Sequence, residues 1–241
     1  MRLYYVRHGQ SENNARWMED SSAYKRVPDP LLTDVGEQQA DLIADFLARR
    51  DVDVAEWDDA SSGFSRFGIT HCYASLMERA VVTGYKIAAA LDLPLLSWVD
   101  VHETGGMFTY DPETDTSYPE SGRSRAYLET HYPRLVLPDT IDDAGWWNRP
   151  REAPELMQPR AERVLAELLD KHGDTADQVV LVSHGGFFNH LVHAILGLPE
   201  TEKLWFTLNN TSITRIDFHA EGRVGVQYVN RRDFLPPELI T

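Results

Sequence analysis

The chain has 241 residues, of which 42% are hydrophobic and 25% are charged, a composition that excludes a disordered protein and fits a globular one. At about 150 residues per domain, this length predicts one large domain with room for an insertion. The formal net charge of −15 disfavours nucleic acids and anionic membranes as partners, because a surface this acidic repels both.

The first part of the sequence predicts a strand, a polar loop and a helix. The apolar run Leu3–Val6 is typical of a buried strand. A polar loop follows, from Asn13 and Asn14 to the turn-forming prolines at 28 and 30. Thr33 then caps a helix whose apolar positions share one face, namely Val35, Leu42, Ile43, Phe46 and Leu47. The acidic, serine-rich residues 51–66 are expected to form an exposed loop.

The middle of the sequence predicts two more strands, a helix between them and a long irregular segment. Ile69–Ala74 is the second expected strand, and Leu95–Val101 is the third. The helix between them has small and apolar residues at helical spacing, namely Ala80, Val81, Gly84, Ile87, Ala88 and Leu91. Residues 104–157 contain many glycines, prolines, tryptophans and tyrosines without a sustained period, which predicts a lid-like insertion.

The last part of the sequence returns to regular elements. Pro159 suits the first turn of a helix that ends at His172. The β-branched run Val179–Val182 predicts a strand, the apolar run Phe187–Leu196 a helix, and residues 213–218 and 224–229 two final strands. Strands that alternate with helices predict a three-layer α/β/α fold with a mainly parallel central sheet. We therefore expect a single domain over residues 1–241 that contains the insertion 104–157.

Cysteine usage and apolar run lengths restrict the setting of the protein. A single cysteine, Cys72, excludes an intramolecular disulfide and any cysteine-based zinc site, and its apolar surroundings predict a buried thiol. The first apolar run is too short for a signal peptide, and no run reaches the ~18 residues of a membrane span. We expect a cytoplasmic protein that is a monomer or a homodimer.

Polar residues follow the expected strands where a ligand would bind. In open α/β sheets, ligands collect beyond the carboxyl ends of the strands. The loops after Val6, Ala74, Val101 and Val182 should therefore face one crevice. They bring two arginines, two histidines and one glutamate to the same edge, namely Arg7, His8, Arg79, Glu103 and His184. Each of these alone has a structural explanation, such as a surface ion pair, but their shared position predicts a site.

The run Arg7-His8-Gly9-Gln10-Ser11-Glu12-Asn13 resembles the R-H-G-x-S-x-x-N signature of the histidine phosphatase superfamily, also called phosphoglycerate-mutase-like, with Asn13 taken as its asparagine. Further segments are similar to motifs of that family in the expected order, namely Leu32–Ala40, Ser75–Thr83 with Arg79, Glu103, Ser183–Gly186 with His184, and Asn210–Thr214. The similarity extends from residue 3 to about residue 218.

These residue types suit the chemistry of a phosphomonoester. Guanidinium groups offer fixed, paired N–H donors to phosphoryl oxygens, so Arg7 and Arg79 form the expected clamp. A neutral imidazole is a good nucleophile near pH 7. The resemblance implies that His8 attacks phosphorus and becomes transiently phosphorylated, while His184 stabilises charge in the transition state. Glu103 would act first as the general acid and then as the general base. The resemblance also implies four substrate-binding positions, namely Gly9, Ser11, Asn13 and Gly185.

A metal-independent phosphomonoester hydrolase is therefore the expected function, with a small phosphorylated metabolite as its partner and without a metal or cofactor. In the glycolytic mutases of the family, an R-H-Y-G type sequence follows the acid, whereas Thr104-Gly-Gly-Met follows Glu103 here, which favours hydrolysis. Three alternatives stay open. They are a phosphoglycerate-type mutase, a non-catalytic phosphate-binding relative, and a metal-dependent hydrolase using His184, His190 and His193.

The insertion supplies candidates for substrate choice. Its arginines could bind a second anionic group of the substrate, or they could pair with the acidic residues of the same segment; they are Arg123, Arg125, Arg149 and Arg151. Its aromatic residues Tyr110, Trp146 and Trp147 could stack on a ring or form a lid, or they could pack the insertion onto the core.

Overall fold

The computed structural model describes residues 1–20, 26–49, 67–147, 149–199 and 203–241. Within these residues, seven strands form one sheet in the order β6-β3-β2-β7-β1-β8-β9. Five neighbouring strands run parallel, namely β6 (Leu135–Val136), β3 (Leu95–Ser97), β2 (His71–Ala74), β7 (Gln178–Ser183) and β1 (Arg2–Arg7). The antiparallel strands β8 (Ile213–Phe218) and β9 (Val224–Arg231) complete the sheet. The prediction of a mainly parallel sheet is confirmed.

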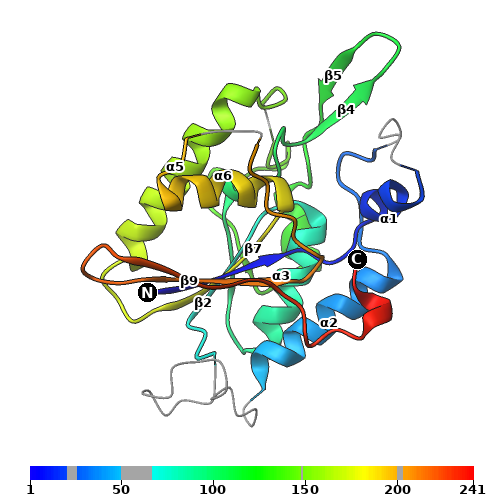
Figure 1. Cartoon of the computed structure of the whole chain (residues 1–241). Coiled ribbons are helices and arrows are strands. Elements are labelled where there is room, and N and C mark those ends of the chain that lie inside the picture. The colour runs from blue at the N-terminus through cyan, green and yellow to red at the C-terminus, as the bar shows by residue number, and fades with distance from the viewer. Residues whose placement is uncertain (21–25, 50–66, 148, 200–202) are drawn as a thin grey trace.

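Helices cover both faces of this sheet (Figure 1). The helices α2 (Asp34–Ala48) and α3 (Glu78–Ala90) pack on one face, and α5 (Pro154–His172) and α6 (Gly185–Leu196) pack on the other. The first hydrophobic core lies between the sheet and the helices α2 and α3, and the second lies between the sheet and the helices α5 and α6. In β1, Tyr4 and Val6 belong to the first core, Leu3 and Tyr5 belong to the second, and all four are fully buried. Successive side chains of a strand point to opposite faces, so a strand covered on both faces needs a continuous apolar run.

The segment after β1 forms a helix where the sequence analysis predicted a loop. This helix, α1, spans Glu12–Glu19 and contains no buried residue, so it leaves no apolar stripe in the sequence. It begins at a capping box, in which the Ser11 hydroxyl accepts a hydrogen bond from the Asn14 backbone and the Asn14 side chain accepts one from the Ser11 backbone. Local capping therefore specifies this helix, and apolar periodicity does not.

Two predicted boundaries were wrong. The helix α5 begins at Pro154, which occupies its first turn, and Pro159 lies inside the helix. A proline is tolerated early in a helix, but Pro159 has no N–H for the bond to residue 155. The predicted strand Leu95–Val101 is a strand only as far as Ser97, and a 3-10 turn at Val99–Val101 (η3) follows it.

The segment 104–157 has more regular structure than its composition suggested. It contains the hairpin β4 (Phe108–Asp111) and β5 (Thr116–Pro119) and the helix α4 (Arg125–His131). It also contributes β6, which pairs in parallel with β3 at the edge of the main sheet. The hairpin projects from the body of the molecule (Figure 1). That this segment is an insertion within one domain stays a prediction.

Two further expectations concern single segments. The predicted loop 51–66 lies outside the described residues. Cys72 is buried in the first core and has a free thiol, as predicted. Among the described helices, none combines the length and the apolar character needed to cross a bilayer.

Candidate functional site

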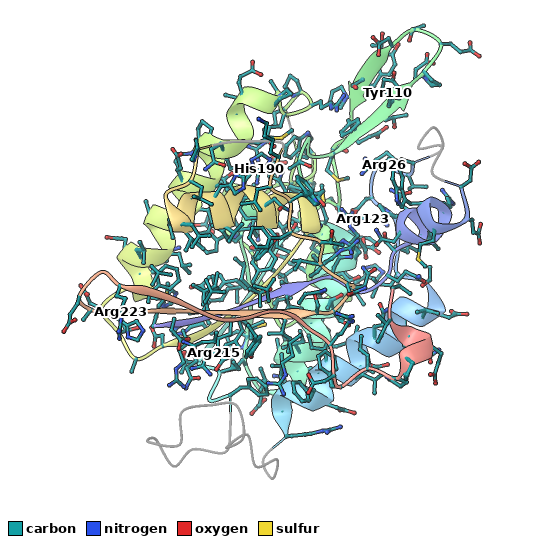
Figure 2. The ribbon with its side chains drawn as sticks, in the orientation of Figure 1. Arg26, Tyr110, Arg123, His190, Arg215 and Arg223 are labelled. Carbon is teal, nitrogen blue, oxygen red and sulfur yellow. The ribbon has the colours of Figure 1, made fainter. Side chains whose placement is uncertain are left out.

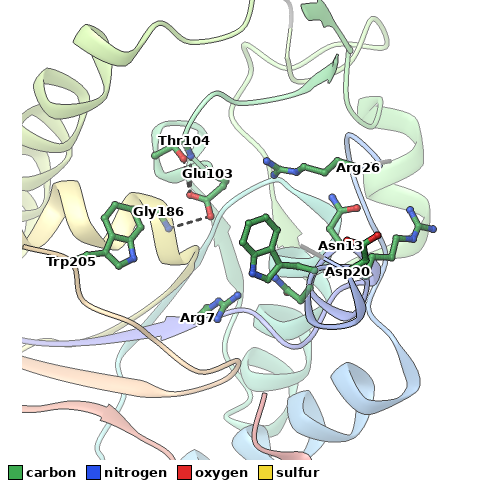
Figure 3. Close-up of a pocket in the computed structure, with 11 residues that line it drawn as sticks. Arg7, Asn13, Asp20, Arg26, Glu103, Thr104, Gly186 and Trp205 are labelled. Atoms are coloured by element: carbon green, nitrogen blue, oxygen red, sulfur yellow. Dashed lines mark hydrogen bonds between the residues drawn. The ribbon is translucent and has the colours of Figure 1, made fainter. Parts of the chain in front are cut away.

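The predicted side chains meet at the carboxyl ends of β1, β2 and β7. His8 follows β1, and its backbone N–H donates to the Ser183 carbonyl at the end of β7 across 3.0 Å. The rings of His8 and His184 lie 5.1 Å apart between centroids. A cavity of about 440 Å³ is lined by Arg7, the neighbour of His8 in the chain, and by Glu103 (Figure 3). The structure thus brings the residues from separate loops into one place, as the strand-end rule predicts.

His8 is held as a neutral imidazole in one tautomer. The Nε atom of Arg79 donates to the Nε2 atom of His8 across 3.0 Å, and an arginine Nε can only donate. Nε2 must therefore carry a lone pair, and the proton lies on Nδ1, which donates to the Gly9 carbonyl across 2.6 Å. Burial lowers the pKa of His8 well below its usual 6.5, and the charges of Arg79 and Arg7 lower it further.

Arg79 is buried, Arg7 is partly buried at the cavity, and both retain unused N–H groups. Within the described residues, Arg7 Nε and Arg79 Nη1 have no hydrogen-bond partner. Another donor of Arg7, Nη1, is fixed by the Leu208 carbonyl at 2.5 Å. Burial lowers the pKa of Arg79 to about 10 and also lowers the pKa of Arg7, although Glu103 opposes this shift in both. Two cations with spare donors beside a nucleophilic nitrogen suit an oxyanion.

His184 adds a third unused donor, and Ser75 determines its tautomer. The Ser75 hydroxyl lies 2.8 Å from His184 Nε2 and accepts the Met77 backbone N–H at 3.3 Å. Nε2 is the acceptor for the Ser75 proton among the described groups, which assigns the proton of His184 to Nδ1, an atom without a partner there. Burial lowers the pKa of His184 well below 6.5, and the charge of Arg79 lowers it further. The sequence analysis assigned Ser75 no role, although it stands in a matched motif.

Glu103 is oriented by backbone donors, two of which belong to the start of α6. Its Oε1 atom accepts the N–H groups of Thr104 at 2.8 Å and Phe187 at 2.9 Å. Its Oε2 atom accepts the N–H of Gly186 at 3.2 Å (Figure 3). A β-carbon at Gly186 would lie 2.4 Å from Oε1 of Glu103, whereas one at Gly185 would make only ordinary contacts with Arg7. The position that has no room for a side chain is therefore Gly186, and not the neighbouring Gly185 that the sequence analysis named.

A buried ion pair holds the loop that carries Glu103. Arg160 of α5 donates to both carboxylate oxygens of Glu152, at 2.6 and 2.8 Å. Its Nη1 atom also donates to the carbonyls of Asp100 at 2.7 Å and His102 at 3.0 Å, immediately before Glu103. Sequence reasoning missed Arg160, because a single arginine in a helix gives no signal of which loop it binds.

Asp29 stands behind the second arginine. Its Oδ1 atom accepts the Glu78 backbone N–H at 2.9 Å and lies 3.9 Å from Arg79 Nη1. Burial raises the pKa of Asp29 to about 6, although the charge of Arg79 opposes the shift. In the sequence this residue was visible only as part of a Pro-Asp-Pro turn.

The other predicted binding positions have mainly structural contacts. Ser11 is the buried cap of α1, and a β-carbon at Gly9 would lie 2.6 Å from the Gly36 carbonyl oxygen. The Asn13 amide bonds both backbone groups of Val27, at 2.8 and 3.0 Å, although it lines the cavity. Counting along the R-H-G-x-S-x-x-N signature places its asparagine at Asn14, not at Asn13. Asn14 also lines the cavity.

The substrate-choice candidates of the segment 104–157 divide into packed and accessible residues. Trp146 and Trp147 are buried and belong to the first core, which supports packing over stacking on a ligand. Arg123 forms an ion pair with Glu78, Arg149 covers Trp147, and Arg125 donates to the carbonyls of residues 138 and 141. Tyr110 and Arg151 line a second cavity, of about 350 Å³.

The three histidines of the metal-dependent alternative do not lie together. His184, His190 and His193 form no group with ligand atoms close together in the described part of the chain. One group there could hold a metal ion, namely His71, His172 and Asp177. It lies at the opposite end of the strands, where His172 Nδ1 is 2.8 Å from Asp177 Oδ2.

Comparisons with known proteins show the family of this chain. The model of the histidine phosphatase superfamily (branch 1) matches residues 3–231. The probable phosphoglycerate mutase GpmB of Serratia proteamaculans is 27% identical over 222 residues, which is 90% of this chain and 85% of that protein. The corresponding protein of Escherichia coli O1:K1 is 29% identical over 220 residues, with the same coverage.

Two solved structures share the fold. Phosphoserine phosphatase from Entamoeba histolytica, in complex with 3-phosphoglyceric acid, has a TM-score of 0.59 at 18% identity and covers 98% of this chain and 99% of that one. A mycobacterial glucosyl-3-phosphoglycerate phosphatase in complex with VO3 has a TM-score of 0.58 at 20% identity, with coverages of 96% and 99%.

Proposed function

Because this chain belongs to the histidine phosphatase superfamily (branch 1), we propose that it is a metal-independent phosphomonoester hydrolase with a phosphohistidine intermediate. One observation carries the proposal. The Nε2 lone pair of a neutral, buried His8 lies beside the buried Arg79 and the partly buried Arg7, both of which have unused N–H donors. A dianionic phosphoryl group would complete those hydrogen bonds and present its phosphorus atom to the nitrogen.

In the first step, Arg7, Arg79 and His184 receive the phosphoryl oxygens through Nε, Nη1 and Nδ1. His8 Nε2 attacks phosphorus in line, so the N–P bond forms while the bond from phosphorus to the ester oxygen breaks. Glu103, in its protonated form, donates its proton to the leaving oxygen. The hydrogen bond from Arg79 Nε to Nε2 breaks when the phosphoryl group binds, which frees the lone pair for this attack, and that donor turns to the phosphoryl oxygens.

In the second step, water replaces the alcohol product. The Glu103 carboxylate accepts a proton from the water as its oxygen attacks phosphorus, and the N–P bond breaks. Inorganic phosphate leaves, and His8 returns to its neutral form with the proton on Nδ1. Glu103 is protonated again, so the cycle closes. The backbone donors at Thr104, Gly186 and Phe187 keep the carboxyl group in one place through both steps.

The test is to trap the intermediate. Brief exposure to a 32P-labelled phosphomonoester, followed by a denaturing quench, should label His8 in a linkage that is stable to alkali and labile to acid. His8→Ala should lose the label and turnover while it keeps its thermal stability within a few degrees. His219→Ala, which alters an exposed histidine at the end of β8, serves as the matched control and should keep both. Label on Ser11, or at least a tenth of the wild-type rate in His8→Ala, would contradict the nucleophile.

A mutase is the second candidate, because the relatives that match most of this chain carry that name. The two reactions share the first step and differ in whether water or a second hydroxyl group of the substrate receives the phosphoryl group. Labelled 3-phosphoglycerate distinguishes them, because a hydrolase releases inorganic phosphate and a mutase forms 2-phosphoglycerate. Hydrolysis that persists in a chelator supports the metal-independent reaction. Phosphate binding without turnover would identify a non-catalytic relative.

A further inference from the structure

The cavity beside Arg7 and Glu103 is larger than a phosphoryl group requires. Its volume of about 440 Å³ falls in the usual range of small-molecule sites, ~300–1,000 Å³. Its lining includes two aromatic residues and two arginines beyond those of the proposed mechanism, namely Trp17, Trp205, Arg16 and Arg26. This outer part of the cavity is where the alcohol portion of a phosphomonoester would lie.

Trp17 and Trp205 are unusual among the described tryptophans. Their exposed fractions are 59% and 60%, whereas Trp98, Trp146 and Trp147 are buried. Large apolar side chains left open to water at the rim of a pocket often mark a binding surface. An indole ring offers a broad apolar face on which a flat ring can stack. Two such residues line the same cavity from different parts of the chain, α1 and the segment before β8.

Hydrogen bonds hold the backbone beside Trp205, and Trp17 lies on a capped helix. The buried Asn189 amide bonds both backbone groups of Phe206, at 2.6 and 3.1 Å, and also donates to the Gly185 carbonyl at 2.9 Å. This attaches the residue after Trp205 to the first turn of α6. On the opposite side, Trp17 lies on the helix that the Ser11 capping box begins. Side chains on fixed supports can bind a ligand with a small loss of conformational entropy.

Arg26 supplies a positive charge to the same space. Its side chain extends towards Glu103 (Figure 3), and it forms no ion pair with any other described residue. Its charge contributes to the lowered pKa of Arg79, which places it within electrostatic reach of the phosphoryl site. It also lines the neighbouring cavity with Arg151. A second anionic group on the substrate would find an unpaired guanidinium at this point.

We propose that Trp17 and Trp205 bind a flat, ring-shaped leaving group and that Arg26 pairs with a negative charge that this group carries. The substrate class is thus a phosphomonoester of an anionic ring compound. The inference rests on the proposed function in one respect, because it assumes that the phosphoryl group lies beside His8.

Calorimetric titration with non-hydrolysable phosphonates tests whether the two tryptophans bind a ring. Phenylphosphonate should bind the wild-type protein at least tenfold more tightly than methylphosphonate. Trp17→Ala and Trp205→Ala should each weaken phenylphosphonate three- to tenfold and change methylphosphonate less than twofold. Trp17→Phe and Trp205→Phe should restore most of the loss, because a phenyl ring still stacks. Equal affinity of the wild type for the two phosphonates, or equal losses of both in the alanine variants, would overturn the ring assignment.

A charged ring tests Arg26. 4-Carboxyphenylphosphonate should bind more tightly than phenylphosphonate, and Arg26→Ala should remove that difference. Arg223→Ala is the matched control, because Arg223 is also exposed but lies at the far side of the molecule (Figure 2). A charge preference that survives in Arg26→Ala would overturn the role of this residue.

The two proposals fail in different ways. Hydrolysis of phosphomonoesters with no preference for a ring would leave the proposed function standing and refute the leaving-group site. Absence of both hydrolysis and phosphonate binding would refute both proposals.

Discussion

The Nε atom of Arg79 donates a hydrogen bond directly to the Nε2 atom of His8 across 3.0 Å, so a cation occupies the lone pair that the proposed reaction uses. This contact keeps the imidazole unprotonated and its ring correctly turned while the cavity holds no phosphoryl group. Binding of an anion must then break the contact, because the arginine turns its donors towards the new oxygens.

Replacing Arg79 with lysine tests this relationship. Arg79→Lys keeps the positive charge but loses both the planar fork and the Nε donor. We expect kcat to fall by a factor of about 10² to 10³, the usual loss for one transition-state donor. Steady-state assays of phosphate release measure kcat. Arg134→Lys is the control, because Arg134 forms an exposed ion pair with Asp92. A loss below fivefold would show that charge alone suffices.

The acid role of Glu103 predicts a dependence on the leaving group. Glu103→Gln should slow alkyl phosphates at least tenfold more than p-nitrophenyl phosphate, because only a poor leaving group needs the proton. Gly186→Ala should show the same pattern more weakly, since the added β-carbon displaces the carboxylate. Parallel decreases for both substrate types would remove Glu103 from the acid role.

The buried histidines predict a loss of stability towards acid. His8, His102 and His184 have pKa values well below 6.5, caused mainly by burial. Between those values and 6.5, the unfolded chain binds more protons than the folded one, so the free energy of unfolding decreases as the pH falls. The slope approaches about 4 kcal/mol per pH unit for three groups.

Asp29 acts in the opposite direction below its pKa of about 6, because its raised pKa makes the folded state bind a proton there. Urea unfolding at pH 7.5, 6.2 and 5.5 measures the sum of these effects. A free energy of unfolding that stays level over this range would contradict the assignment of three neutral histidines.

Asp29 also predicts an acidic limb in the pH–rate profile. Above pH 6 its carboxylate attracts Arg79 across 3.9 Å, and protonation at lower pH removes that attraction. We expect kcat/KM to decrease as the pH falls through about 6, and Asp29→Asn should lower the plateau and abolish this limb. Comparing both proteins on one substrate cancels the ionisation of the substrate itself. An unchanged limb in the variant would assign it to another group.

The sheet and its ligand edge could be predicted because they depend on local patterns. Runs such as Leu3–Val6 identify strands covered on both faces, and the strand-end rule then brings His8 and His184 to one edge. The helix α1 gave no such pattern, since none of its residues is buried. Its capping box pairs Ser11 with Asn14 and lacks the glutamate or glutamine of the usual sequence signature.

Supporting residues were harder to predict, because their roles depend on distant partners. Ser75 determines the tautomer of a histidine that lies 109 positions away in the chain. Arg160 holds a loop about 60 residues before it. The predicted start of α5 near Pro159 was wrong, because two prolines lie near that start and composition does not show which one occupies the first turn.

The amide of Asn189 joins the two parts of the molecule to which we assign substrate selection and proton transfer. It holds the backbone beside Trp205 and the first turn of α6, whose N–H groups orient Glu103. Remodelling the segment before β8 for a new substrate would therefore disturb the proton donor as well. Among related proteins with this arrangement, substrate selectivity would change more easily at Trp17 and Arg26, which these hydrogen bonds do not attach to α6. The segment that carries Trp205 would tend to be conserved.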